Sequence, residues 1–298
     1  MSDPRFGRVV TAMVTPFDAS GAVDIDVAVD LAQFLVAEGS EGLVLAGSTG
    51  EGSALSDDEK LVLFAAVAEA VDVPVLAGTS SSDTARAVDL TRRASSTGID
   101  GILATTPAYA RPSQAGIAAH LGAMADATTL PVMLYDIPSR TGRKISSATA
   151  VALATSRPNV VALKDASGDL AAAAHTAAVL GAGLDLYSGD DSLTLPFLAV
   201  GAVGVVSVAA HWAGPEFAQM VGAALSGDWA RARAINERLA ASYAFESSEQ
   251  APNPIPTKAA LRALGRAVGQ CRWPLGPADD TVDQAAARVV RELRERRG

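Results

Sequence analysis

Cysteine, histidine and lysine are scarce in this chain of 298 residues, and each scarcity argues against a class of site. Cys271 is the only cysteine, so the chain cannot form an internal disulfide or a cysteine-based metal cluster. We expect Cys271 to act as a small apolar side chain. The three histidines, His120, His175 and His211, are too scattered to indicate a set of metal ligands. The sequence therefore implies neither a metal nor a cofactor.

Long apolar runs and basic tracts are also missing. No stretch reaches the roughly 18 uninterrupted apolar residues that a membrane helix needs, and residues 1–5 lack the pattern of a secretory signal. The formal net charge is −9, and no basic tract is interleaved with aromatic residues as in many nucleic-acid-binding proteins. We expect a soluble, cytoplasmic protein that binds neither membrane nor nucleic acid.

What the chain does contain is a regular alternation of short apolar runs and longer alanine-rich segments. Hydrophobic residues make up 49% of the composition, which is enough for a large core. Eight runs are predicted strands, at residues 9–14, 42–46, 74–77, 101–105, 131–135, 160–164, 184–188 and 204–208. Strands that are apolar on both faces and separated by helices indicate a parallel sheet, and eight of them favour a closed (β/α)8 TIM barrel of the α/β class.

The strand pattern stops after about residue 211. The remaining sequence predicts helices at residues 215–225, 229–245, 257–267 and 281–296. We therefore expect a catalytic barrel over residues 1–225 and a C-terminal helical domain over residues 226–298.

Lys164 is the most unusual residue of the predicted strands. It is one of four lysines against 20 arginines, and it follows the apolar run at residues 160–163. Burial disfavours the ammonium form, lowers the pKa and leaves a free amine that can attack a carbonyl carbon. The alternative is a structural lysine that extends to water or pairs with Asp165.

Other polar residues also follow the predicted strands. They occupy residues 47–51 (GSTGE), 106–112 (TPAYARP), 135–142 (YDIPSRTG) and 189–191 (GDD). Active sites of TIM barrels lie at the carboxyl ends of the strands, so these segments and Lys164 predict a single site. Asp190 and Asp191 have no third ligand nearby in the sequence, and we expect them to cap the helix that follows.

These motifs resemble a known family. The segments at residues 11–17 (TAMVTPF), 47–51, 135–138 and 253–258 (NPIPTK) are similar to those of the dihydrodipicolinate synthase and N-acetylneuraminate lyase superfamily, over essentially the whole chain. Residues 139–142 (SRTG) most resemble the synthase branch, which condenses pyruvate with L-aspartate-4-semialdehyde in lysine and diaminopimelate biosynthesis. The resemblance implies a Schiff-base lyase without a cofactor, assembled as a homotetramer from two dimers.

The resemblance also implies catalytic roles. Lys164 would form the imine with pyruvate, and Tyr135 would be the general acid and base beside it. Ser48 would pass protons between Tyr135 and Tyr109. Tyr109 matches a tyrosine that reaches across a dimer interface into the neighbouring active site.

Substrate-binding roles follow from the same resemblance. Thr49 would bind the pyruvate carboxylate, while Gly189 and Val206 would line the pyruvate pocket. Arg140 would bind the carboxylate of the semialdehyde, for which its planar guanidinium is suited.

Two alternatives stay open. One is another pyruvate-dependent lyase of the superfamily, such as an N-acetylneuraminate lyase or a keto-sugar-acid aldolase or dehydratase. Ser48 favours it, because the synthases usually have threonine there, whereas Arg140 argues against it. The other is a non-catalytic barrel that binds a ligand, which the presence of Lys164, Tyr135 and Thr49 disfavours.

Feedback inhibition by lysine is common among the synthases, at a site between subunits that resembles the region of Asp57, Lys60 and Arg86. Lysine-sensitive members carry a histidine or similar group near position 60 and a glutamate near position 86. Lys60 and Arg86 would repel a cationic effector, so we expect weak or absent feedback.

Overall fold

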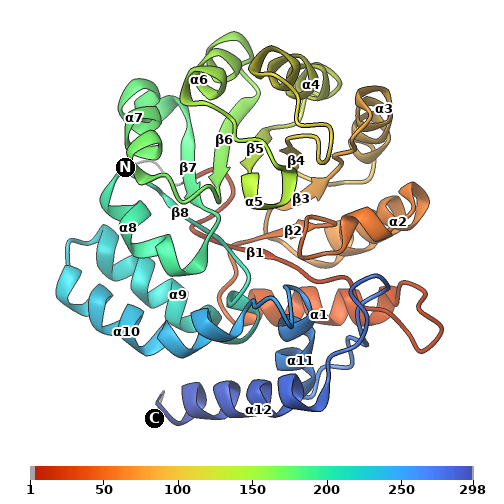
Figure 1. Cartoon of the computed structure of the whole chain (residues 1–298), viewed down its shortest axis with the longest axis vertical. Coiled ribbons are helices and arrows are strands. Elements are labelled where there is room, and N and C mark those ends of the chain that lie inside the picture. The colour runs from red at the N-terminus through yellow and green to blue at the C-terminus, as the bar shows by residue number, and fades with distance from the viewer. Residues whose placement is uncertain (1–3, 297–298) are drawn as a thin grey trace.

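The computed structural model describes residues 4–296 and has a closed barrel of eight parallel strands in sequence order (Figure 1). The strands are β1 Val9–Ala12, β2 Gly42–Leu45, β3 Val75–Gly78, β4 Gly101–Thr105, β5 Val132–Asp136, β6 Val160–Asp165, β7 Asp185–Ser188 and β8 Gly204–Ser207. β1 pairs with β8 and closes the ring. The predicted TIM barrel is confirmed.

Helices surround the barrel, and the C-terminal helices that follow the last strand lie together on one side of it (Figure 1). The helices are α1 Ile25–Ala37, η1 Gly52–Ala54, α2 Asp57–Ala70, α3 Thr84–Ala94, α4 Gln114–Asp126, α5 Pro138–Thr141, α6 Ser147–Ser156, α7 Leu170–Leu180, η2 Gly181–Gly183, η3 Asp191–Leu193, α8 Thr194–Ala199, α9 Ala210–Leu225, α10 Trp229–Phe245, α11 Ile255–Ala263 and α12 Asp280–Glu295. None of the helices within residues 4–296 is both long and apolar enough to cross a bilayer.

The sequence did not predict two of these features. α5 is a single turn that begins with Pro138 and ends at Gly142, whose positive φ closes it. α9 begins five residues before the predicted start, and its backbone leaves helical geometry at Ala213. The kink places Pro215 in the first turn of the straight part of α9, where a missing N–H costs little.

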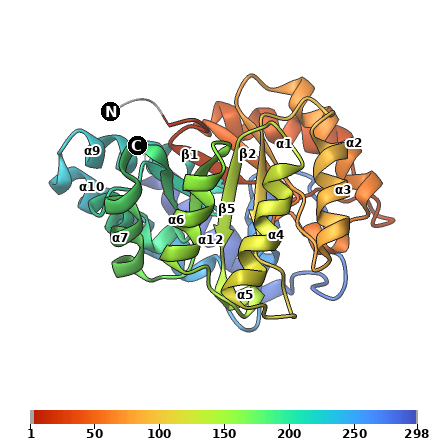
Figure 2. The same ribbon diagram turned by 90° about the horizontal axis from the view of Figure 1, so that it is seen from above.

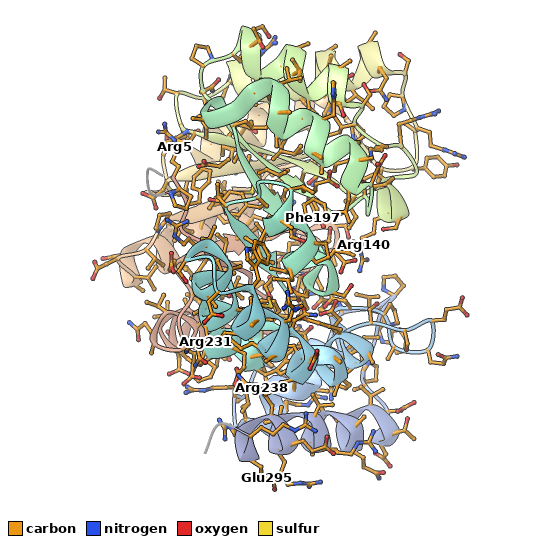
Figure 3. All side chains as sticks on the ribbon, turned by 90° about the vertical axis from the view of Figure 1, so that its left-hand side faces the viewer. Arg5, Arg140, Phe197, Arg231, Arg238 and Glu295 are labelled. Carbon is orange, nitrogen blue, oxygen red and sulfur yellow. The ribbon has the colours of Figure 1, made fainter. Side chains whose placement is uncertain are left out.

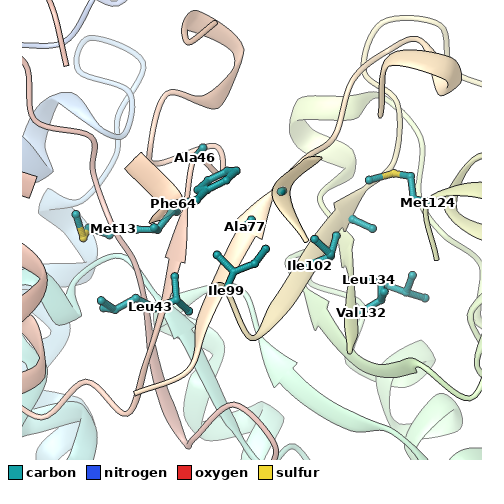
Figure 4. Close-up of a cluster of buried hydrophobic side chains, with 14 of the residues drawn as sticks. Met13, Leu43, Ala46, Phe64, Ala77, Ile99, Ile102, Met124, Val132 and Leu134 are labelled. Carbon is teal, nitrogen blue, oxygen red and sulfur yellow. The ribbon is translucent and has the colours of Figure 1, made fainter. Parts of the chain in front are cut away.

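Side chains alternate between the two faces of every strand and form two separate apolar layers. Outward-facing residues such as Leu43, Ile102 and Leu134 form one apolar cluster with helix residues such as Phe64 and Met124 (Figure 4). The barrel interior is filled by Val10, Ala12, Val44, Leu76, Leu103, Met133, Tyr135, Ala162, Tyr187 and Val206. Because this alternation has a period of two, the residues that face the interior are fixed by their parity along each strand.

One end of the barrel is closed by side chains. Phe6 is buried there, and Tyr187 donates a hydrogen bond from its hydroxyl to the carbonyl of Gly7 at 2.9 Å. The other end, where the strands terminate, carries α5 directly after β5 (Figure 2). Any site that reaches the barrel interior must therefore open at the carboxyl ends of the strands.

The C-terminal helices share an apolar cluster with the barrel. Trp212 of α9, Leu239 of α10 and Val290 of α12 pack in one cluster with Val9 and Val205 of the barrel wall. The predicted division between residues 225 and 226 stays a prediction, and apolar packing is continuous across it.

Candidate active site

Lys164 and Tyr135 face each other inside the barrel. They are register partners on β6 and β5, each about 4% exposed, and Nζ of Lys164 lies 4.3 Å from the centroid of the Tyr135 ring. Burial lowers the pKa of Lys164 to about 8. Burial also raises the pKa of Tyr135 to about 12, although the hydrogen bond with Ser48 acts in the opposite direction and lowers it. The arrangement therefore pairs an amine that loses its proton easily with a phenol that keeps it.

The loop after β2 brings Ser48 and Thr49 to the same end of the barrel. Ser48 is hydrogen-bonded to Tyr135, whereas Thr49 is buried and accepts a hydrogen bond from Asn253 Nδ2 at 2.9 Å. Ala46 and Glu51, on either side, both have φ near +50°. Non-glycine residues adopt such a conformation at a cost, and this kind of strain concentrates at functional sites.

Asn253 links this loop to the predicted carboxylate-binding arginine. Its carbonyl oxygen accepts a hydrogen bond from Arg140 Nη2 at 3.0 Å, and its amide oxygen accepts one from Thr257. Figure 3 shows Arg140 at the edge of the barrel beside the C-terminal segment. No role was predicted for Asn253 from the sequence, although it lies in the NPIPTK motif at residues 253–258.

Glu51 and Lys258 form a buried ion pair that fastens the same loop. Their Nζ–Oε1 distance is 2.7 Å, both side chains are 1% exposed, and Glu51 Oε2 also accepts the backbone N–H of Arg272. Lys258 Nζ donates to the carbonyl of Gln270 as well. This pair was not predicted from the sequence, although Lys258 is, like Lys164, one of only four lysines in the chain.

Gly189 and Val206 complete the inner wall. Val206 is fully buried in the barrel interior. A Cβ on Gly189 would lie 3.0 Å from Lys164 Cγ and 2.9 Å from Ala166 Cβ, so a side chain there would press on the lysine.

The two aspartates after Gly189 differ in what they bind. Asp190 caps η3 by accepting the N–H of Ser192, as predicted. Asp191 does not cap that helix, so this part of the prediction is wrong. Its buried carboxylate accepts the N–H groups of Val208 and Ala209 instead, because the carboxyl end of β8 and the start of α9 lie beside the β7 loop.

Tyr109 is the one predicted catalytic residue that is not gathered with the others. Its side chain is 96% exposed, and its φ is +69°. A large aromatic side chain held in water by a strained backbone is not explained by the fold of a single chain.

A cavity of about 500 Å³ opens beside this cluster. Its lining includes Ser48 and Arg140, and also Asp57, Lys60 and Arg86. Within residues 4–296, no three His, Cys, Asp or Glu side chains group as metal ligands would.

Comparison with known proteins places the chain in a family. The sequence profile of the dihydrodipicolinate synthetase family matches residues 5–293. The chain belongs to this family. A relative from Synechococcus sp. (strain CC9605), named 4-hydroxy-tetrahydrodipicolinate synthase, is 50% identical over 99% of this chain and 98% of its own. A 4-hydroxy-tetrahydrodipicolinate synthase 2 from Halalkalibacterium halodurans is 47% identical over 97% of this chain and 99% of its own.

Solved structures of the family have the same fold. The dihydrodipicolinate synthase of Cyanidioschyzon merolae, crystallised with lysine bound, superimposes with a TM-score of 0.94 at 41% identity, covering 98% of this chain and 99% of that one. A synthase from Bacillus anthracis gives a TM-score of 0.92 at 39% identity, covering 97% and 98%. The similarity to enzymes of this family thus extends over nearly the whole chain.

Whether the Glu51–Lys258 ion pair stabilises the loop after β2 can be tested by substitution. Lys258→Met leaves the Glu51 carboxylate buried without its cation, so we expect the free energy of unfolding to fall by about 3–5 kcal/mol. The double variant Glu51→Gln, Lys258→Met removes both charges and should recover most of that loss. Urea unfolding followed by circular dichroism measures both; equal losses in the two variants would contradict the assignment.

Proposed function

We propose that this protein is a 4-hydroxy-tetrahydrodipicolinate synthase that condenses pyruvate with L-aspartate-4-semialdehyde through an imine on Lys164. The observation that carries the proposal is the buried Lys164 amine, which faces Tyr135 inside the barrel. Full-length relatives at 45–50% identity that bear this name support the choice of reaction.

The chemistry assigns successive tasks to Lys164 and Tyr135. The free amine of Lys164 adds to the C2 carbonyl of pyruvate, and the carbinolamine loses water to give a protonated imine. Loss of a methyl proton from that imine gives an enamine, which adds to the aldehyde carbon of the semialdehyde. Attack of the semialdehyde's amino group on the imine carbon closes the ring and releases Lys164. Tyr135, protonated at neutral pH and hydrogen-bonded to Ser48, supplies and recovers protons in these steps.

Substrate binding is divided between the inner wall and the rim. We assign the pyruvate carboxylate to Thr49 and the loop N–H groups around it, with Gly189 and Val206 forming the wall beside the methyl group. Arg140, exposed at the cavity and held through the carbonyl of Asn253, would receive the carboxylate of the semialdehyde.

Tyr109 fits this scheme only in an assembly. Its exposed ring supports a role in a neighbouring subunit, where it would join the proton relay of Ser48 and Tyr135. We therefore propose a homotetramer made of two dimers, acting in the cytoplasm as the sequence predicted.

The choice of second substrate tests the function directly. Purified protein given pyruvate should consume L-aspartate-4-semialdehyde and leave N-acetylmannosamine untouched, with both followed by chromatography. Borohydride added with pyruvate alone should fix an adduct that peptide mass spectrometry places on Lys164. Consumption of N-acetylmannosamine instead would identify a neuraminate lyase, and the absence of any adduct would exclude both reactions.

Arg140 offers a second test. Arg140→Ala removes a charged hydrogen bond to one substrate only, so the KM for the semialdehyde should rise about 10- to 100-fold while the KM for pyruvate changes little. Arg157→Ala is the matched control, because Arg157 pairs with Asp126 away from the cavity. Steady-state kinetics with each substrate varied in turn measure the effect, and equal increases in both KM values would argue against this role.

Three residues of the cavity lining, Asp57, Lys60 and Arg86, concern feedback inhibition by lysine. Arg86 donates to both carboxylate oxygens of Asp57, at 3.1 and 3.0 Å, and Lys60 is buried beside them. The carboxylate is thus already neutralised, and two cations face any incoming ammonium group. We expect the enzyme to keep most of its activity in millimolar lysine.

Arg86→Glu replaces one of these cations with a carboxylate and should strengthen inhibition by lysine. Initial rates measured against lysine concentration compare the two proteins. Strong inhibition of the unaltered protein would show that Lys60 and Arg86 do not repel the effector.

A further inference from the structure

Two acidic side chains that have no task in the scheme above lie against each other. Asp191, in η3, is 2% exposed, and Glu246 is the residue that ends α10. Their side chains are hydrogen-bonded to one another. Asp191 Oδ1 and Glu246 Oε2 are both buried, and apart from the pair itself no N–H or O–H group in the described part of the chain donates to either. A hydrogen bond between two carboxyl groups needs a proton on one of them, so the pair holds one proton and one negative charge.

The surroundings decide which acid keeps the proton. Asp191 Oδ2 accepts the N–H groups of Val208 at 2.9 Å and Ala209 at 2.7 Å, at the N-terminal end of α9, where an anion is stabilised. Burial raises the pKa of both acids, but at Asp191 the hydrogen bonds from the Val208 and Ala209 N–H groups oppose this effect. Glu246 stands at the C-terminal end of α10, where the helix dipole disfavours an anion, and burial raises its pKa to about 11. The charge therefore belongs to Asp191 and the proton to Glu246.

The course of the chain brings this charge beside Lys164. β6 and β7 are neighbours, Lys164 is in register with Tyr187, and Gly189 packs against the Lys164 side chain two residues before Asp191. The carboxylate of Asp191 raises the pKa of Lys164 against the larger effect of burial, whereas Arg140 lowers it.

Other titratable groups near the pair do not alter this balance. Tyr243, on α10, has its pKa raised by burial and by the two acids, so it stays neutral. His211, on α9, has its pKa lowered by burial to about 4 and is also neutral at pH 7. Asp190 is half-buried, and its side chain caps η3 by accepting hydrogen bonds from the N–H and the hydroxyl of Ser192.

We propose that Asp191 is the counter-ion of the protonated imine at Lys164, and that Glu246 is a positioning residue that holds the carboxylate in place by donating a hydrogen bond to it. This inference rests on the imine chemistry proposed above. Imine formation consumes the free amine and the ketone oxygen, releases water and leaves one positive charge on nitrogen. A fixed anion in a site without water stabilises that charge without reorganising.

The arrangement also explains why the counter-ion does not touch the nucleophile. Asp191 acts on Lys164 through space and forms no hydrogen bond with it. A direct ion pair would hold the amine as ammonium and prevent its attack on pyruvate. With its oxygens occupied by Val208, Ala209 and Glu246, the carboxylate stays at a distance.

Two variants that differ by one carboxylate test this. Glu246→Gln replaces the protonated acid by an amide that still donates to Asp191, so the charge stays. Asp191→Asn with Glu246→Gln removes the charge and retains an oxygen that can accept the Val208 and Ala209 N–H groups. The pKa of Lys164 is read from the pH dependence of its carbamylation by cyanate, quantified by peptide mass spectrometry without pyruvate. Borohydride trapping of the pyruvate imine and steady-state kinetics are measured on the same proteins.

We expect Glu246→Gln to leave the pKa of Lys164 unchanged and the double variant to lower it by about one to three units. The double variant should also need about tenfold or more pyruvate for half-maximal trapping. A structural cap without electrostatic effect would alter thermal unfolding and leave the pKa of Lys164 and the pyruvate dependence unmoved, which would overturn the proposal.

Two further outcomes are decisive. A pKa lowered as much by Glu246→Gln alone would place the charge on Glu246 and contradict the assignment; this measurement stands even if the double variant fails to fold. If the unaltered protein forms no pyruvate adduct, the proposed function fails, whereas the carbamylation results still decide whether Asp191 sets the charge state of Lys164.

Discussion

The burial of a single lysine amine is the constraint on which the rest of this molecule depends. An ammonium group inside a closed barrel is costly, so Lys164 must either lose its proton or find compensating charge. Both solutions are used in part. Burial lowers the pKa of Lys164, so that its amine loses the proton more easily. The Tyr135 ring beneath the amine and the Asp191 carboxylate, which is not hydrogen-bonded to it, compensate the positive charge. The burial that makes an ammonium group costly at position 164 is therefore also what makes the amine of Lys164 reactive.

The C-terminal segment is the second support of the site. Asn253 binds both the Thr49 hydroxyl and the Arg140 guanidinium, and the Glu51–Lys258 pair ties the loop after β2 to the same segment. These contacts join the rim of the barrel to residues far later in the chain: Asn253 lies 113 positions after Arg140 and 204 positions after Thr49. The helices after the barrel therefore shape the site as well as cover apolar surface.

Local patterns predicted most of the fold correctly. Apolar runs that are short, rich in valine and leucine and separated by capped helices specify parallel strands, and the capping box of Ser56 and Glu59 is present at the start of α2. The errors concern features that the sequence does not reveal. α5 is too short to show periodicity, and the partners of Asp191 come from the connection between β8 and α9, which the chain reaches only later.

The sequence by itself determined the barrel and the inward orientation of Tyr135 and Lys164, because the alternation of a strand fixes which side chains share a face. Only the tertiary structure decided which polar groups meet. The hydrogen bonds of Asn253, the ion pair of Lys258 and the contact between Asp191 and Glu246 join residues distant in sequence. Desolvation, which shifts the pKa values of the buried groups, exists only once the chain has closed around them.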